Sequence, residues 1–240
     1  MILRFQPLAL WAILSLAPSA CLGAGEDAGA DGDGTDHLGS LLPWKAGNSW
    51  TYRVTDDDGT TTKVTTISAA PEPVGLGPLK DTMAYRVITQ KADGTDQTIS
   101  WQMRLDEMVV RYREQSYAAS TGQLELEEYW QPYKLHIDGS PERTKAGAMW
   151  AAEYEETKVD VADGVLGTPS TETTDDVWKV LNPSTDRVGV TVPVGTFEDP
   201  VVIQKAGGSS IKTYWYVRGI GKVKETGGQT EELVSFTVSP

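Results

Sequence analysis

The sequence predicts an all-β protein, an antiparallel meander that forms a curved sheet or a half-open barrel of about a dozen strands. From about Trp44 onward, apolar and polar residues alternate, as at Trp50, Tyr52 and Val54. That period is typical of strands, which are enriched in β-branched and aromatic residues. Pairs such as Asp58-Gly59, typical of tight hairpin turns, separate the alternating runs. No long helical repeat with capping residues competes with this pattern.

The first twenty residues predict a secretory signal. Arg4 is the only charged residue before Cys21, and an apolar run over residues 8–17 follows it. The run is too short to span a bilayer as a stable helix, which needs roughly 20 residues. A short basic start, an apolar stretch and small residues at its end are typical of a signal peptide. We therefore expect residues 1–20 to direct export.

Cys21 is the only cysteine of the chain, and small residues precede it. Ser19-Ala20-Cys21 resembles the lipobox of bacterial lipoproteins, in which the cysteine is lipidated, with acyl chains such as palmitate, and becomes the new N-terminus. Pro18 departs from that pattern, since this position usually carries leucine. The alternative is a plain secreted protein that is cut near Ala24 and loses Cys21. We favour lipidation, because a free thiol would be a liability in a secreted chain.

Residues 21–40 predict a flexible acidic tether. They are rich in Gly, Ala and Asp, with no EF-hand glutamate to complete a calcium loop. Leu22, and not aspartate, follows Cys21, so the inner-membrane retention signal of enteric bacterial lipoproteins is absent, which favours an outer-membrane location. The chain of 240 residues and 26.0 kDa carries a net charge of -13, which argues against nucleic acid as a partner. The predicted partners are the membrane, through the lipid, and an envelope protein or a lipid ligand.

Residues 41–240 predict one β domain. Within it, residues 140–154 fit a helix start at Ser140-Pro141 as well as a strand. A short repeat favours the strand: Lys45-Ala-Gly-x-x-Trp50 recurs as Lys145-Ala-Gly-x-x-Trp150. The first copy opens a clear strand, so we expect the second to do the same. The repeat suggests two similar sheet halves that face one another.

Three motifs near the ends of the domain carry a resemblance. They are Gly47-Asn48-Ser49-Trp50-Thr51-Tyr52, then Pro193-Val194-Gly195-Thr196-Phe197, then Tyr214-Trp215-Tyr216-Val217-Arg218-Gly219-Ile220-Gly221-Lys222-Val223-Lys224. They resemble a loose group of secreted or lipid-anchored β lipoproteins from environmental Gram-negative bacteria such as myxobacteria, a group without an assigned activity. The motifs cover about a quarter of the chain, and the resemblance implies structural roles for them. The predicted shape is also similar to that of the envelope lipoprotein carriers LolA and LolB, an analogy that does not determine function.

Candidate acid–base groups are better explained as structural residues. Glu125 and Glu127 alternate with Leu124 and Leu126, which predicts a solvent-facing row beside Glu128. Asp56-Asp57-Asp58 is typical of a hairpin turn, and Glu198-Asp199 of a strand end. His136 is expected to be a surface or cross-strand residue, and His37 lies beside the tether. We therefore predict no catalytic residue, no metal site and no cofactor.

Tryptophan is the remaining signal. Five residues fall on strands at phases that point inward: Trp50, Trp101, Trp150, Trp178 and Trp215. Core packing is the preferred interpretation. The alternative is that they line a concave face that holds a lipid or another apolar ligand.

The sequence therefore predicts a lipid-anchored outer-membrane lipoprotein that acts as a non-enzymatic binding or structural module. A carrier of lipid or another apolar ligand is the second hypothesis. A hydrolase of envelope polymers is the third, and no site in the sequence supports it.

Overall fold

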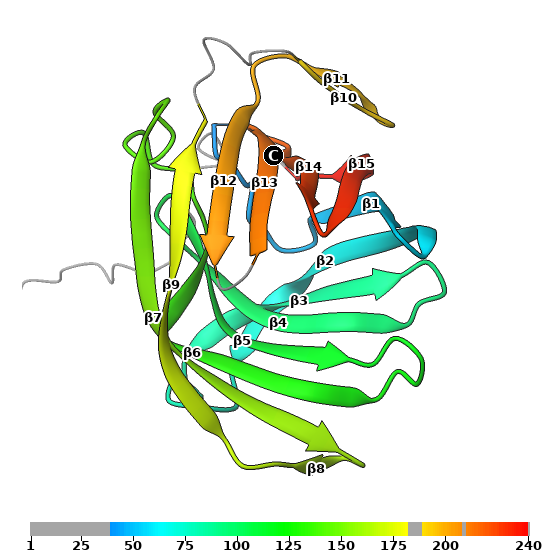
Figure 1. Cartoon of the computed structure of the whole chain (residues 1–240), viewed down its shortest axis with the longest axis vertical. Coiled ribbons are helices and arrows are strands. Elements are labelled where there is room, and N and C mark those ends of the chain that lie inside the picture. Colours follow the sequence, from blue (N-terminus) through cyan, green and yellow to red (C-terminus); the bar gives the residue numbers. More distant parts are fainter. Residues whose placement is uncertain (1–38, 182–188, 208–209, 240) are drawn as a thin grey trace, which may run out of the picture. The chain divides into compact units, whose positions relative to one another are not determined.

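The computed structural model describes residues 39–181, 189–207 and 210–239, all within one compact unit (Figure 1). These residues form strands and connecting turns, and none of them lies in a helix. The first strands are β1 (Ser49–Asp56), β2 (Gly59–Pro73), β3 (Met83–Lys91), β4 (Asp96–Leu105), β5 (Met108–Tyr117), β6 (Leu124–Asp138), β7 (Met149–Ala162) and β8 (Val165–Leu166). The others are β9 (Ser170–Val180), β10 (Val190–Val192), β11 (Gly195–Phe197), β12 (Val201–Gly207), β13 (Ser210–Val217), β14 (Gly221–Gly227) and β15 (Gln229–Thr237).

Twelve of the strands form a closed antiparallel barrel. Their order around the ring is β6-β5-β4-β3-β2-β1-β15-β14-β13-β12-β9-β7, and β6 pairs with β7. The first and last strands also pair, with Ser49 opposite Thr237 and Thr55 opposite Thr230. Closure leaves no free edge in the ring, which protects the strands from pairing with other chains. β8 pairs antiparallel with the end of β7, and β10 and β11 form a separate hairpin.

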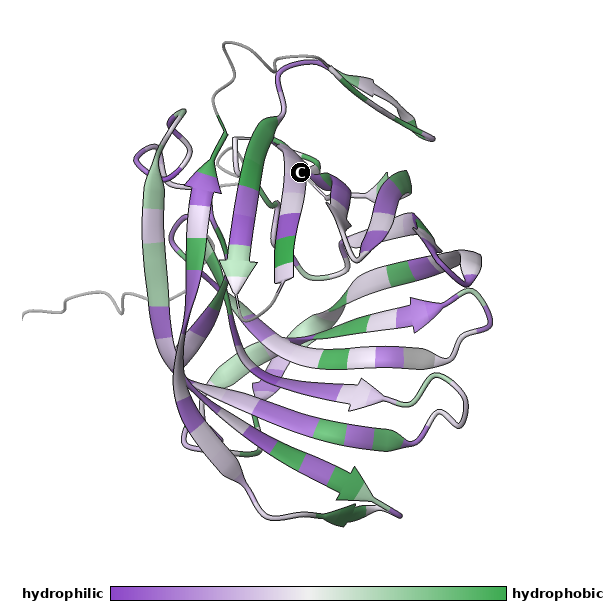
Figure 2. Cartoon of the chain, in the orientation of Figure 1, coloured by the Kyte–Doolittle hydropathy of each residue, from purple (hydrophilic) through white to green (hydrophobic). Residues whose placement is uncertain are grey.

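The predicted fold class is confirmed. The all-β content, the antiparallel meander and the number of strands agree with the sequence prediction. The ring is closed, whereas the sequence left a curved sheet or a half-open barrel. Figure 2 shows the alternation behind the prediction, as hydrophilic and hydrophobic bands that succeed one another along the strands. The predicted signal over residues 1–20 and the predicted tether up to residue 38 stay predictions, because residues 1–38 lie outside the described part of the chain.

Residues 39–48 close one end of the barrel. Leu41, Leu42 and Trp44 are buried there. The Asn48 side chain donates to the carbonyl of Pro43 and accepts from the backbone N–H of Ser239, so the two ends of the domain are tied together. This segment therefore forms the base of the barrel.

Residues 74–82 cover part of the outer surface. The Val74 N–H donates to the carbonyl of Thr82, and Val74 is fully buried. Beneath this segment the Trp101 indole donates to Glu72 Oε1 at 3.0 Å. The barrel wall therefore has a second layer on this side, which explains why outward-pointing residues of β4 to β6 are buried.

The two copies of the short repeat have the same local structure. In each, the glycine N–H donates to a carbonyl of a neighbouring strand in the ring: Gly47 to Ile67 of β2, and Gly147 to Val180 of β9. Both glycines have a positive φ, 80° and 78°, which favours glycine at these turns. β1 and β7 then begin after each turn, so the expected strand after residue 148 is confirmed. The two strands lie on opposite sides of the ring, since six steps of the strand order separate them.

Candidate functional site

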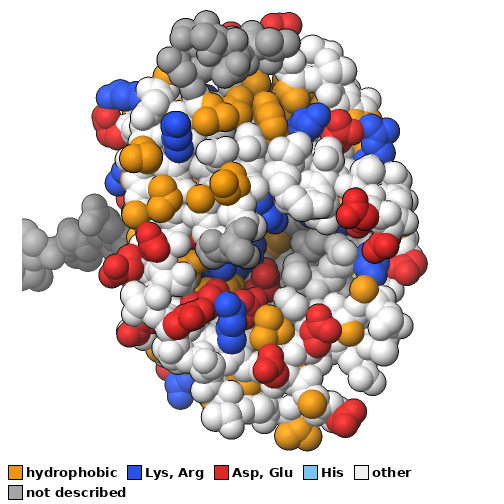
Figure 3. Space-filling model, viewed as in Figure 1, with side chains coloured by type: hydrophobic (Ala, Val, Ile, Leu, Met, Phe, Trp, Pro, Cys, Tyr) orange, Lys and Arg blue, Asp and Glu red, His pale blue; other side chains and the backbone are white. Residues whose placement is uncertain are grey.

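The barrel encloses a cavity of about 790 Å³, and Figure 3 shows the molecule hollowed at its centre, with acidic and basic side chains around the hollow. This volume lies within the range of ordinary small-molecule sites, about 300–1,000 Å³. The walls are unusually rich in charge for a cavity. The basic lining residues are Lys63, Lys91, Arg111, Lys134, Lys158, Lys205, Lys212 and Lys222, and the acidic ones are Glu114, Glu128, Glu156, Glu172, Asp176, Glu225 and Glu231.

The cavity changes character along its depth. Its base is apolar and aromatic, with Leu42 and Trp44 from the closing segment and Trp50 and Leu135 from β1 and β6. The Trp44 and Trp50 rings stack with centroids 6.4 Å apart. The other end is lined by residues at hairpins, among them Ala119. A ligand that entered there would meet the charged walls first and the aromatic base last.

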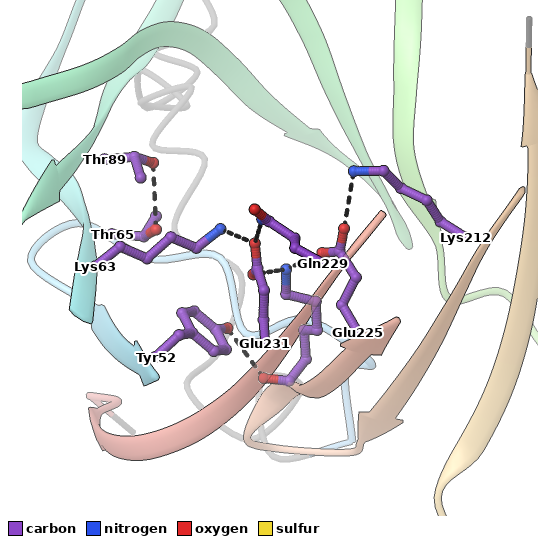
Figure 4. A network of polar contacts seen from close by, with 9 residues as sticks. Tyr52, Lys63, Thr65, Thr89, Lys212, Glu225, Gln229 and Glu231 are labelled. Atoms are coloured by element: carbon purple, nitrogen blue, oxygen red, sulfur yellow. Dashed lines mark hydrogen bonds and ion pairs between the residues drawn. The ribbon is translucent and has the colours of Figure 1, made fainter. Parts of the chain in front are cut away.

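A lysine–glutamate network occupies the wall formed by β1, β2, β13, β14 and β15 (Figure 4). Lys222 Nζ bonds to Glu225 and also to Glu231 Oε2, the latter at 2.8 Å. Lys63 of β2 forms an ion pair with Glu231 of β15. Lys212 Nζ lies 2.9 Å from Glu225 Oε1. Three ammonium groups thus share two carboxylates inside the barrel.

Burial and pairing set the ionisation of this network. Burial alone would lower the pKa of Lys222, but attraction to Glu225 and Glu231 holds it well above its ordinary value. Burial opposes ionisation of Glu225 and Glu231, and the neighbouring lysines nevertheless keep both pKa values low. Lys63 differs, since burial and the charge of Lys222 lower its pKa despite its pairing with Glu231. Lys222, Glu225 and Glu231 are therefore ionised at neutral pH.

Tyr52 contacts both Lys222 and Lys63. Its hydroxyl donates to the backbone carbonyl of Lys222 at 3.0 Å. The Lys222 and Lys63 ammonium groups lie 4.9 and 5.7 Å from the centroid of the Tyr52 ring, within cation–π range. The ring thereby joins the charged layer to the aromatic base.

A second network covers the wall of β6 and β7. Glu156 accepts from the Trp130 indole at 2.8 Å and forms ion pairs with Lys134 at 3.2 Å and Lys158 at 2.7 Å. Burial would raise the pKa of Glu156, but these hydrogen bonds and charges lower it to about 2. Between the two networks, Lys205 pairs with Asp176 at 2.8 Å.

Two carboxylates face each other on β5 and β6. Glu114 and Glu128 are direct cross-strand partners, and both line the cavity. Arg111 pairs with Glu114 at 2.5 Å. Burial, and then the charge of Glu114, raises the pKa of Glu128. This is the one part of the described cavity wall where acidic groups outnumber the cations that bind them.

His136 lines the base of the cavity, contrary to the expectation of a surface or cross-strand role. Its ring centroid lies 6.3 Å from that of Trp44. Burial, followed by the charges of Arg111 and Lys222, lowers its pKa well below the ordinary value. The imidazole is therefore neutral at physiological pH, and it belongs to the less polar end of the cavity.

The five predicted tryptophans occupy three environments. Trp50 and Trp178 line the cavity. Trp150 stacks on Trp178 with centroids 6.1 Å apart, but it is not part of the lining. The predicted inward phase is wrong for Trp101, which lies on the outer face beneath residues 74–82 because its neighbours Ser100 and Gln102 take the interior positions. Trp215 is also absent from the lining and lies partly buried with the Lys224 ammonium 5.9 Å from its ring. Sequence reasoning missed the charged lining, although Lys212 has the same strand phase as Tyr214 and Tyr216, and all three line the cavity.

The prediction that Glu125 and Glu127 share a solvent-facing row is wrong for Glu127, which is only 2% exposed and binds Arg113 beneath the outer segment. Asp56 does serve the β1–β2 turn, where its Oδ1 accepts from the N–H groups of Asp58 and Gly59. Cys21 and His37 lie outside the described residues.

No group of three or more His, Cys, Asp or Glu side chains among the described residues is arranged to hold a metal ion. No helix long and apolar enough to cross a membrane occurs in this part of the chain.

Comparison with known proteins assigns no family to this chain. No family model matches the chain, and no curated protein matches its sequence. A crystal structure from Bacteroides fragilis, described as a "putative exported protein with YmcC-like fold", is similar over 82% of this chain and 98% of its own, with 11% identity and a TM-score of 0.49. A likeness at this level carries no functional argument, so the resemblance to myxobacterial lipoproteins stays a prediction.

Proposed function

We propose that this protein is a non-enzymatic binding module of the bacterial cell envelope and that the barrel cavity is its binding site. The observation that carries the proposal is the cavity itself, about 790 Å³ in volume and lined by buried charged side chains. Burying charge costs free energy even when the charges are paired. A barrel that only needed a stable core would be better served by apolar side chains, so the polar lining favours a ligand.

Unpartnered polar atoms support this proposal. Four lining residues carry a buried polar atom with no hydrogen-bond partner among the described residues: Trp44 Nε1, Gln102 Oε1, Arg111 Nε and Trp178 Nε1. Buried polar groups in folded proteins normally have partners. Water or a polar ligand that reached these atoms after a small side-chain adjustment would supply the missing hydrogen-bond partners.

A carrier of lipid is the second candidate, and the aromatic base around Trp44 and Trp50 favours it. The charged walls argue against a wholly apolar ligand. Such a ligand would displace water from the charged side chains without replacing the hydrogen bonds that the water made. A carrier function therefore requires an amphiphilic ligand.

A hydrolase remains the least supported candidate. Its acid and base would have to lie on either side of the substrate. Glu114 and Glu128 lie on neighbouring strands of one wall, and Glu156, Glu225 and Glu231 are engaged in ion pairs. These positions favour binding over acid–base chemistry.

The location is proposed from the sequence. The predicted signal over residues 1–20 and the lipobox at Cys21 support export and anchoring in the outer membrane through a lipid. In this proposal the acidic tether separates the barrel from the membrane surface.

Native mass spectrometry of the full chain, purified gently from its own envelope, tests the proposal. We expect a bound species that dissociates on denaturation. Thr174→Trp would fill the cavity from β9 and remove that species, whereas Thr173→Trp on the exposed face of the same strand would keep it. A bare mass for the unsubstituted protein, or equal occupancy in the two variants, would refute a cavity ligand.

A further inference from the structure

We propose that the ligand of this cavity is a zwitterion with an apolar portion, a deepening that rests on the proposed binding function. The argument uses three features of the lining: a wall with excess positive charge, an opposite wall with excess negative charge, and an aromatic base. Two kinds of molecule have this chemistry. One is an apolar amino acid or short peptide, and the other is a lipid with a zwitterionic headgroup.

The topology places the two charged walls across the cavity from each other. In the ring of twelve strands, β15 lies six steps from β6, which is the opposite position. Glu231 of β15 belongs to the lysine–glutamate network, and Glu128 of β6 belongs to the facing wall. A ligand in the centre of the cavity would have one wall on each side.

The wall of β2, β13, β14 and β15 has an excess of positive charge. Its lining cations are Lys63, Lys212 and Lys222, whereas its lining carboxylates are Glu225 and Glu231. Lys212 binds Glu225 through a single oxygen and is 40% exposed, so its ammonium retains donors that can reach a ligand. An anionic group, carboxylate or phosphate, would balance this wall.

The facing wall has an excess of negative charge. On β5, β6, β7 and β9 the lining cations are Arg111, Lys134 and Lys158, and the lining carboxylates are Glu114, Glu128, Glu156, Glu172 and Asp176, the last of which is paired with Lys205 of β12. Arg111 is bound to Glu114, while Lys134 and Lys158 are bound to Glu156. Lys158 lies opposite Glu128 in the β6–β7 pairing, but it is bound to Glu156 and lies 3.9 Å from Glu172. Glu128 and Glu114 thus share this part of the wall with more carboxylates than cations, and an ammonium group would balance them.

The remaining lining charges do not alter this polarity. Lys205 and Asp176 neutralise each other between the two walls. Lys91 stands at the end of β3, where its Nζ donates to the carbonyl of Ala119. The axis of charge therefore runs across the barrel, from the lysine wall to the glutamate wall.

The aromatic base supplies the third element. Leu42, Trp44, Trp50 and Leu135 offer an apolar surface at the closed end of the cavity. A ligand with an apolar portion would bury it there and keep its charges at the level of the two walls. A singly charged ligand would balance one wall and leave the other unpaired, and complementary potentials on both sides favour the dipolar partner.

Tryptophan fluorescence and calorimetric titration of the purified full chain test this inference, with matched probes used below their micellar concentrations. The first set is leucyl-leucine, its N-acetyl derivative, which is an anion, and its amide, which is a cation. The second set is dihexanoylphosphatidylcholine and the anionic dihexanoylphosphatidic acid. In one set we expect the zwitterion to bind at least about tenfold more tightly than its singly charged analogues, a difference of about 1.4 kcal/mol. The set that shows the preference identifies the source of the ligand.

Two substitutions assign the preference to the walls. Glu128→Gln is expected to reduce the preference for the zwitterion over the anion to less than about threefold. Lys212→Gln is expected to reduce the preference for the zwitterion over the cation to the same extent. Lys145→Gln, at an exposed ion pair outside the cavity, is the matched control and should change neither.

The outcomes separate the two proposals. If a singly charged analogue binds as tightly as the zwitterion in both sets and Thr174→Trp blocks it, the inference is wrong and the binding function stands. If no zwitterion binds while the native protein carries a cavity ligand of another charge type, the inference is again wrong. If no probe binds and the native mass is bare, both proposals fail.

Discussion

Arg113 of β5 holds Glu127 of β6 in a two-pronged ion pair on the outer face of the barrel, with Nε and Nη2 at 2.9 and 2.7 Å from the two carboxylate oxygens. The guanidinium also donates to the carbonyl of Val74 at 2.8 Å and lies 4.1 Å from the centre of the Trp101 ring. One side chain therefore ties two strands of the barrel to the segment that covers them.

Removing Arg113 is expected to destabilise the fold strongly. Arg113→Met leaves the carboxylate of Glu127 buried without its cation and the Val74 carbonyl without a donor, at a cost of about 3–5 kcal/mol. Urea unfolding measures this free energy. Lys145→Met breaks an exposed pair with Glu142 and should cost less than about 1 kcal/mol. Equal costs for the two variants would show that the buried pair is not the connection described here.

Stability should fall in acid because the paired carboxylates have low pKa values in the folded state. Glu156 has a folded pKa of about 2, against an ordinary value of 4.5. A carboxyl whose pKa is lowered by folding contributes stability above its unfolded pKa and loses it as the pH falls toward the folded value. The unfolding free energy should therefore be nearly constant from pH 7 to about 5.5 and decrease from there toward about pH 2, because the folded carboxylates resist protonation.

Glu156→Gln is the matched variant for this prediction. It should be less stable than the unsubstituted protein at pH 7 and should show a shallower loss of stability below pH 4.5. Denaturant titrations at a series of pH values measure both effects. Parallel pH curves for the two proteins would contradict the assignment to Glu156.

Glu128→Gln should stabilise the empty protein at neutral pH, although it is expected to weaken the preference for a zwitterion. Burial and Glu114 raise the folded pKa of Glu128, so its ionised form opposes folding above the unfolded pKa. The gain should shrink as the pH falls through the raised folded pKa toward the unfolded value of about 4.5, and it should be lost below that value, where the carboxyl is protonated in both states. Thermal unfolding at pH 7 and pH 4 measures the difference, and a destabilised variant at pH 7 would contradict it.

The β14–β15 turn provides a paired test of backbone packing. A Cβ added to Gly227, at φ 121°, would lie 2.3 Å from the Ile211 carbonyl oxygen, whereas one on Gly228, at φ 79°, would meet nothing within 4 Å. Gly228→Ala should cost about 1–2 kcal/mol, the strain of a left-handed backbone. Gly227→Ala should cost clearly more, because backbone must move. Chemical unfolding compares the two, and a smaller cost at Gly227 would contradict the close approach of β13.

Several parts of the fold follow from local sequence. Trp50 and Tyr52 alternate with polar residues, and the period of two predicts a strand without any knowledge of its neighbours. The turns at Lys45–Gly47 and Lys145–Gly147 were recognisable because the same residues recur before Trp50 and Trp150. Local backbone preference and side-chain period are sufficient for these elements.

The tertiary structure alone decided which face of each strand is the interior. Glu127 and Glu128 are neighbours on β6, so alternation requires them to point to opposite faces but does not assign either one. Pairing of β1 with β15 closes the ring around a charged cavity, and residues 74–82 bury the outer face beside Trp101. The sequence by itself determined the strands and their turns, because those depend on residues close together in the chain. The location of the charges depended on contacts between residues up to about 190 positions apart, such as Asn48 with Ser239, and only the closed barrel brings those together.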